Sequence, residues 1–118
     1  MTIDADLRLV ARDFGLPDRV IRFAQAVIEA EGGGDHIITA VRLSVPTVKT
    51  REDALRILCR SIVHRMCDFC ISTDLRLYGF TPYFASFWAP VGVANDPTHL
   101  NENFVTNVSR FLSEAEDA

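Results

Sequence analysis

The residue of this chain best suited to chemistry is Glu31, which stands at the predicted end of a helix, directly before Gly32, Gly33 and Gly34. Glu31 lies four residues beyond Val27 and continues the apolar stripe of that helix, so its carboxyl group is expected at the edge of the core. Partial burial and the negative end of the helix dipole would both raise its pKa. A carboxylic acid that stays protonated near neutral pH can protonate the departing sugar oxygen during glycosidic bond cleavage. The alternative is a solvated Glu31 followed by glycines that only end the helix.

A second group of residues able to contact a ligand is the aromatic run between residues 78 and 88. Aromatic faces can stack on the apolar faces of sugar rings, but such runs also build hydrophobic cores. The residues expected inside the protein are Phe84, Phe87 and Trp88. The residues expected at the wall of a substrate cleft are Tyr78, Phe80 and Tyr83, two of which carry a hydroxyl group.

The cysteines do not predict a metal centre or a cofactor. Cys59, His64, Cys67 and Cys70 cluster at the end of one predicted helix, where residues three apart turn by about 60° per step, so one helix cannot easily direct them all at one ion. A disulfide framework is not expected from three cysteines. A thioredoxin-like redox motif would sit at the start of a helix, whereas Cys67 and Cys70 come late in this one. We therefore predict buried, hydrophobic cysteines, no metal and no cofactor.

The elements that must position these residues are mainly helical. Apolar residues at helical spacing, with proline, threonine and glycine at the boundaries, predict helices over residues 4–14, 17–31, 51–69 and 81–88 and a last one that starts at Asp96-Pro97. In the last helix a single stripe is formed by Leu100, Phe104, Val108 and Phe111. Loose alternation from Ile37 to Val48 predicts a short strand or extended loop. The expected fold is a compact, mainly α domain of about five helices with a short irregular or β segment.

Length and composition agree with one globular domain spanning residues 1–118. The chain has 48% hydrophobic and 24% charged residues, and its apolar runs are too short to cross a bilayer. The formal net charge is −4 and the basic residues are scattered, so nucleic acid is not an expected partner. Acidic residues near Met1 replace the positive charge of a secretory leader. We therefore expect synthesis in the cytoplasm without a signal peptide, with release or export depending on another factor.

Five segments resemble a known family: Ile21–Gly33, Thr50–Leu55, Phe84–Gly92, Asn95–Pro97 and Leu100–Val108. Their order is similar to that of small lysozyme-like, lytic-transglycosylase-type muramidase domains of phages and bacteria. The resemblance covers most of the chain from Pro17 onward. It implies a lysozyme-like helical fold, the glycan strands of cell-wall peptidoglycan as substrate, and Glu31 as general acid and later general base.

The resemblance also implies a mechanism that needs one acid. In a lytic transglycosylase the substrate's own N-acetyl group acts as nucleophile, and the product closes into an anhydro sugar. An inverting or retaining hydrolase would need a second carboxylate. The candidates for that second group are Asp35, Glu52, Asp53 and Asp74, and spacing selects none of them.

The chain departs from the family pattern between Asp35 and Pro46. Those domains usually carry an arginine- and asparagine-rich stretch ending in asparagine-proline-glycine at this place, and it contributes to substrate positioning. The departure leaves a second hypothesis open, in which the chain is a non-catalytic lysozyme-like module with a binding or structural role.

Overall fold

Six α-helices make up most of the residues that the computed structural model describes, which are residues 2–69, 80–89 and 103–117. The helices are α1 (Ile3–Asp13), α2 (Asp18–Ala30), α3 (His36–Arg42), α4 (Arg51–Phe69), α5 (Phe80–Trp88) and α6 (Phe104–Asp117). The mainly α class predicted from the sequence is confirmed.

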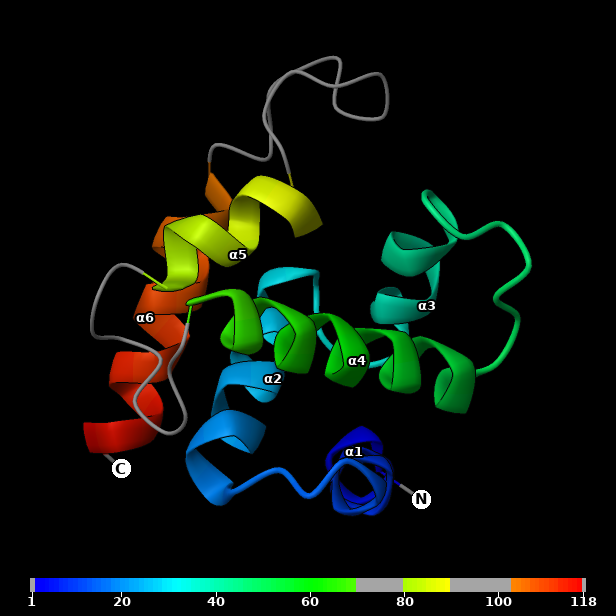
Figure 1. The fold of residues 1–118 in the computed structure, drawn as a ribbon, viewed down its shortest axis with the longest axis horizontal. Coiled ribbons are helices and arrows are strands. Elements are labelled where there is room, and N and C mark those ends of the chain that lie inside the picture. The colour runs from blue at the N-terminus through cyan, green and yellow to red at the C-terminus, as the bar shows by residue number, and fades with distance from the viewer. Residues whose placement is uncertain (1, 70–79, 90–102, 118) are drawn as a thin grey trace.

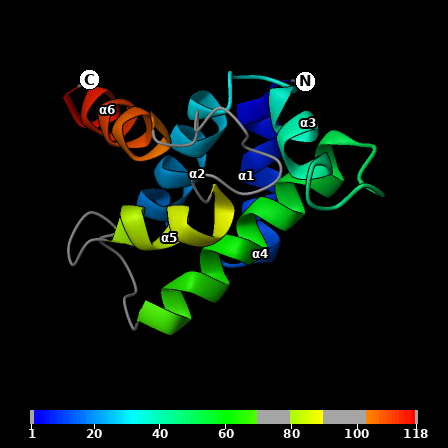
Figure 2. The same ribbon diagram turned by 90° about the horizontal axis from the view of Figure 1, so that it is seen from above.

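Helix α4 crosses the middle of the molecule and contacts α1, α2, α3 and α5. In Figure 1 and, turned by 90°, in Figure 2, α3 lies over the first half of α4 and α5 over its second half. Helix α2 packs against α1, α4 and α6, and α5 also contacts α6. Helices α2 and α4 therefore form the centre on which the remaining elements are assembled.

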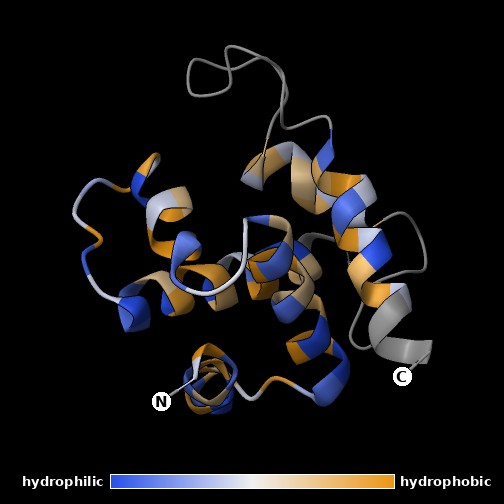
Figure 3. Cartoon of the chain, turned by 180° about the vertical axis from the view of Figure 1, so that it is seen from behind, coloured by the Kyte–Doolittle hydropathy of each residue, from blue (hydrophilic) through white to orange (hydrophobic). Residues whose placement is uncertain are grey.

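The helices are amphipathic, and Figure 3 shows hydrophilic and hydrophobic bands alternating along them. Helix α2 has seven buried residues, and three of them, Phe23, Ala24 and Val27, are fully inaccessible to solvent. The ring of Phe23 meets those of Phe80 and Phe84 edge to face, with 5.3 Å between centroids in each pair. This aromatic cluster joins α2 to α5 and fixes the two helices relative to each other.

Threonine side chains cap the starts of two helices, α4 and α1, and the cap at Thr50 was predicted from the sequence. The Thr50 hydroxyl oxygen accepts a hydrogen bond from the Asp53 amide at 3.1 Å, and the first turn of α4 carries Glu52 and Asp53. Helix α4 runs from Arg51 to Phe69, which agrees with the predicted range. At α1, the hydroxyl of Thr2 accepts from the Ala5 amide at 3.2 Å.

The prediction of a strand or extended loop from Ile37 onward is wrong for residues 37–42, which form most of α3. The buried side chains of α3 are Ile37 and Val41, four residues apart, and this face packs on α4. The described part of the chain contains no strand, so an extended Ile37–Arg42 segment would have left its backbone groups unpaired there. Helix formation satisfies these groups locally.

Some sequence predictions concern residues outside the described part of the chain. They are Tyr78, Cys70, Asp74, Leu100 and the expected helix start at Asp96-Pro97. Further along the predicted last stripe, Phe104 and Val108 are buried in α6 and Phe111 is partly buried. Among the described helices, none is long and apolar enough to span a membrane.

Candidate functional site

The end of α2 has the hydrogen bonds of a Schellman motif. The Gly33 amide donates to the Ile28 carbonyl at 2.9 Å, and the Gly32 amide donates to the Glu29 carbonyl at 3.1 Å. Gly32 has a φ of +110°, which side chains with a Cβ rarely adopt. The glycine run therefore ends the helix, and it does so one residue after Glu31, at the point where the chain turns toward α3.

The carboxyl group of Glu31 meets the indole of Trp88. The Trp88 Nε1–H donates to Glu31 Oε1 at 3.3 Å, across 57 positions of sequence. Both side chains are partly buried. Because the bond joins the end of α2 to the end of α5, tertiary packing places the acid beside an aromatic residue at the edge of the core, as was expected for Glu31.

The indole of Trp88 packs on the aromatic cluster of the core. It stacks on Phe84, with 5.6 Å between ring centroids and 21° between planes, and Phe84 is 1% exposed. Phe84 in turn contacts Phe23 of α2 and Phe104 of α6. The packing of Phe84 between α2 and α6 thus positions the surface on which the indole stacks, with its N–H directed at Glu31.

Burial raises the pKa of Glu31 above its usual value, because the charged form loses hydration; the Trp88 hydrogen bond opposes this and lowers the pKa. The effect of burial is the larger. When the group is protonated, Trp88 can still donate to Oε1 while the proton stays on the other oxygen. The arrangement is therefore able to present a proton-donating carboxyl group with a defined orientation.

The two described residues that were expected at a cleft wall, Phe80 and Tyr83, differ in their exposure to solvent. Phe80 is fully buried in the cluster with Phe23, so it does not form a surface wall in this structure. Tyr83 is partly exposed and contacts Phe87, with 5.2 Å between the ring centroids. Tyr83 and Phe87, four residues apart, share a stripe of α5 that differs from the stripe of Trp88.

Two of the three aromatic residues expected inside the protein are not fully buried. Phe84 is buried as predicted, but Phe87 is 50% exposed and Trp88 is partly buried. The guanidinium of Arg65 in α4 lies 3.7 Å from the centroid of the Phe87 ring, so a cation rather than the core covers one face of that ring. The residue that the structure brings to Glu31 is thus Trp88, which sequence reasoning assigned to the core. The sequence signal that could have predicted this contact is the indole N–H, because a Trp side chain in the protein interior usually needs a hydrogen-bond acceptor.

The segment after the glycines is tied to two other helices through Arg51 at the start of α4. Arg51 Nε donates to Asp35 Oδ1 at 2.6 Å, and Arg51 Nη1 donates to Asp6 Oδ2 at 2.8 Å. The hydrogen bond from Arg51 lowers the pKa of Asp35. Asp35 immediately precedes α3, so this clamp connects α1, α3 and α4 at the far side of the glycine turn.

The other described carboxylates considered as a second catalytic group are engaged elsewhere or lie at a different surface. Glu52 accepts from Arg56 at 3.4 Å along α4. Asp53 lines a pocket between α4 and the preceding loop. Among the described residues, no group of three or more His, Cys, Asp or Glu side chains is arranged to hold a metal ion.

Comparison of the chain with known protein families, with curated proteins and with solved structures gave no match.

Proposed function

We propose that this protein cleaves the glycan strands of peptidoglycan and that Glu31 is its general acid and later its general base. The observation that supports this proposal best is the partly buried Glu31 carboxyl, with its raised pKa and its hydrogen bond to Trp88. Glycosidic bond cleavage requires a protonated carboxyl group beside the leaving oxygen. The lysozyme-like resemblance of the sequence assigns the same role to the same residue.

The proposed reaction begins with proton transfer from Glu31 to the glycosidic oxygen. Trp88 donates to one carboxyl oxygen, which leaves the other to carry the proton toward the substrate. As the glycosidic bond breaks, the resulting carboxylate is stabilised by the same indole N–H, since hydrogen bonds to a charged acceptor are the stronger ones. The carboxylate then acts as the base that removes a proton from the attacking hydroxyl group.

A mechanism with a single acid fits the described carboxylates best. Asp35 is bound by Arg51 at 2.6 Å and Glu52 is bound by Arg56, so both have cationic partners of their own. Asp53 lines a pocket that Glu31 does not line. The substrate's N-acetyl group would supply the nucleophile, and the 6-hydroxyl group of the same sugar would close the anhydro ring. We therefore propose a lytic transglycosylase in preference to a two-carboxylate hydrolase.

The test is muropeptide analysis of purified peptidoglycan after incubation with the wild type, Glu31→Gln and Glu29→Gln. Glu29 is exposed and lies on the same last turn, so Glu29→Gln is a matched control. We expect mass spectrometry to detect anhydro ends with the wild type and Glu29→Gln, and none with Glu31→Gln.

The other outcomes separate the alternatives. Products from Glu31→Gln at the wild-type rate would exclude Glu31 as the acid. Reducing ends in place of anhydro ends would indicate a hydrolase. Co-sedimentation of the wild type with insoluble peptidoglycan, without release of any product, would indicate the non-catalytic binding module instead.

A further inference from the structure

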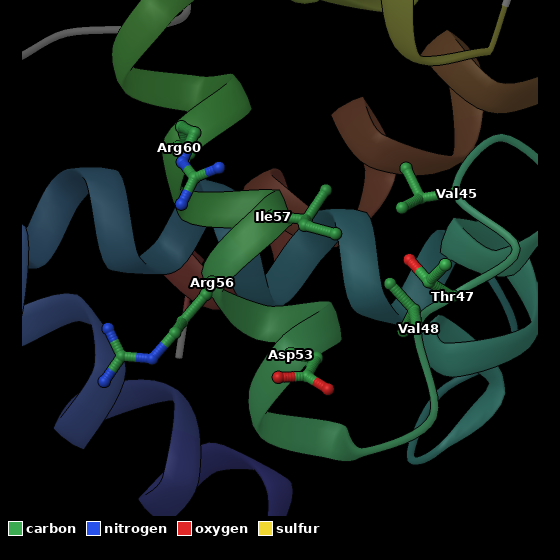
Figure 4. Close-up of a pocket in the computed structure, with 7 residues that line it drawn as sticks. All are labelled: Val45, Thr47, Val48, Asp53, Arg56, Ile57 and Arg60. Atoms are coloured by element: carbon green, nitrogen blue, oxygen red, sulfur yellow. The ribbon is translucent and has the colours of Figure 1, made fainter.

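A pocket of about 320 Å³ lies between the first half of α4 and the loop that joins α3 to α4. Its apolar lining consists of Val45 and Val48 from the loop and Ile57 from α4. The polar part of the lining consists of Thr47 from the loop and of Asp53, Arg56 and Arg60 along α4 (Figure 4). The site therefore combines an apolar centre with an acidic and a basic end.

The two charges at the ends of the pocket are available to a ligand. Asp53 and Arg60 are both exposed, and neither side chain has an ion-pair partner within the described ranges. Arg56 also borders the pocket, but its guanidinium donates to Asp13 of α1 at 2.8 Å. Figure 4 shows the Arg56 side chain directed away from Ile57, toward α1. Arg60 is thus the cation that a bound anion would meet.

The spacing of the charges limits the size of the ligand. Asp53 and Arg60 are seven residues apart, so they lie on nearly the same stripe of α4, roughly 10 Å apart along its axis. Ile57 lies between them on this face. An extended peptide advances about 3.3–3.6 Å per residue, so roughly three residues would span the distance.

Hydrogen bonds to backbone carbonyl groups hold the loop side of the pocket in place. Arg42 Nε donates to the Val48 carbonyl at 2.9 Å, and the Val48 amide donates to the Val45 carbonyl at 3.1 Å. Val48 is 3% exposed and anchors the loop in the core. A pocket that is already formed spares the ligand part of the entropy needed to order its site.

We infer that this pocket binds a short peptide that carries an ammonium group and a carboxylate roughly 10 Å apart. The ammonium group pairs with Asp53, the carboxylate pairs with Arg60, and the apolar part of the peptide lies against Ile57 and the two valines. The chemical class matches the stem peptides of peptidoglycan, which carry acidic and amino-bearing side chains. This assignment to the stem rests on the proposed function, whereas the charge and size requirements come from the pocket alone.

The test is calorimetric titration of the full chain with a soluble stem tripeptide, acetylated alanyl-γ-glutamyl-lysine, whose only ammonium group is on the lysine. We expect Asp53→Asn and Arg60→Gln each to weaken binding roughly fivefold, as for a partly solvated charge pair. Arg22→Gln is the matched control, because Arg22 is an exposed arginine of α2 that does not line the pocket. It should bind like the wild type.

A second peptide tests whether the lysine ammonium group pairs with Asp53. When the lysine side chain is also acetylated, we expect the wild type to lose the same factor of roughly five, and Asp53→Asn to cause no further loss. Absence of binding to the wild type, or equal losses in Arg22→Gln and Arg60→Gln, would overturn the inference.

The outcome is independent of catalysis. Glu31→Gln should bind the tripeptide like the wild type, because Glu31 does not line this pocket. Peptide binding without glycan cleavage by the wild type would support the pocket and contradict the proposed function. Glycan cleavage without peptide binding would contradict the pocket alone.

Discussion

Replacing Gly32 by alanine tests whether the geometry after Glu31 depends on a backbone that only glycine adopts. Gly32 has a φ of +110°, and a Cβ built there would lie 3.1 Å from Cγ of His36. Gly34 offers a matched comparison two residues later. Its φ is +52°, within the left-handed region that other residues can occupy, and a Cβ there would have no neighbour within 4 Å.

The two substitutions should differ in free energy of unfolding. A sparsely populated backbone conformation costs about 1–3 kcal/mol, and the contact with His36 adds to it. Alanine also restricts the unfolded chain, which offsets about 0.4–1 kcal/mol of the lost stability. We expect a net loss of about 2 kcal/mol for Gly32→Ala. For Gly34→Ala, the left-handed backbone of a residue with a Cβ costs about 1–2 kcal/mol. The restriction of the unfolded chain offsets part of this cost, so the net loss of stability should be roughly 0.5–1 kcal/mol.

Urea denaturation followed by circular dichroism measures this difference. With a slope of about 1.5 kcal/mol/M, Gly32→Ala should lower the midpoint by roughly 1.3 M and Gly34→Ala by roughly 0.5 M, with the slopes unchanged. Equal midpoints for the two variants, or a larger loss for Gly34→Ala, would refute the argument from φ and from the His36 contact.

Three further predictions concern the site and the core. Burial raises the pKa of Glu31 above 4.5, so the native state binds more protons at this group than the unfolded chain does, and stability falls as pH rises from about 4.5 through the folded pKa. Urea midpoints should therefore show Glu31→Gln gaining stability relative to the wild type between pH 4 and pH 7. A difference between the two proteins that stays constant with pH would contradict this. Cys59 is buried as predicted, and burial raises its pKa to about 11, but the prediction of a buried cysteine is wrong for Cys67, which is exposed on the last turns of α4. Iodoacetamide and peptide mapping should therefore find Cys67 labelled in the native protein and Cys59 only after unfolding. Rapid native labelling of Cys59 would contradict its burial. Phe80→Ala should lower the free energy of unfolding by about 3–5 kcal/mol in the same urea assay, because the ring is fully buried. A loss below about 1 kcal/mol would mean that Phe80 is a surface residue.

The sequence by itself determined the features that depend on neighbouring residues. Helix α4 begins at Arg51 because Thr50 accepts from the Asp53 amide, and helix α2 ends after Ala30 because Gly32 supplies a positive φ. These are interactions between residues two or three positions apart, so spacing and residue type were enough to place them. The position of Glu31 at the edge of the core also followed, from the apolar stripe that it extends.

Only the tertiary structure decided which side chains meet across the chain. Ile37–Arg42 alternates loosely in sequence, but it is a helix because Ile37 and Val41 pack together on α4. Trp88 and Phe80 both belong to one aromatic run, yet Trp88 reaches Glu31 while Phe80 lies in the core. The packing of α5 against its neighbouring helices determines which stripe of α5 faces inward, and a one-residue step along a helix turns a side chain by about 100°. A local pattern predicts a stripe, but the partner of that stripe is set by helices that are distant in sequence.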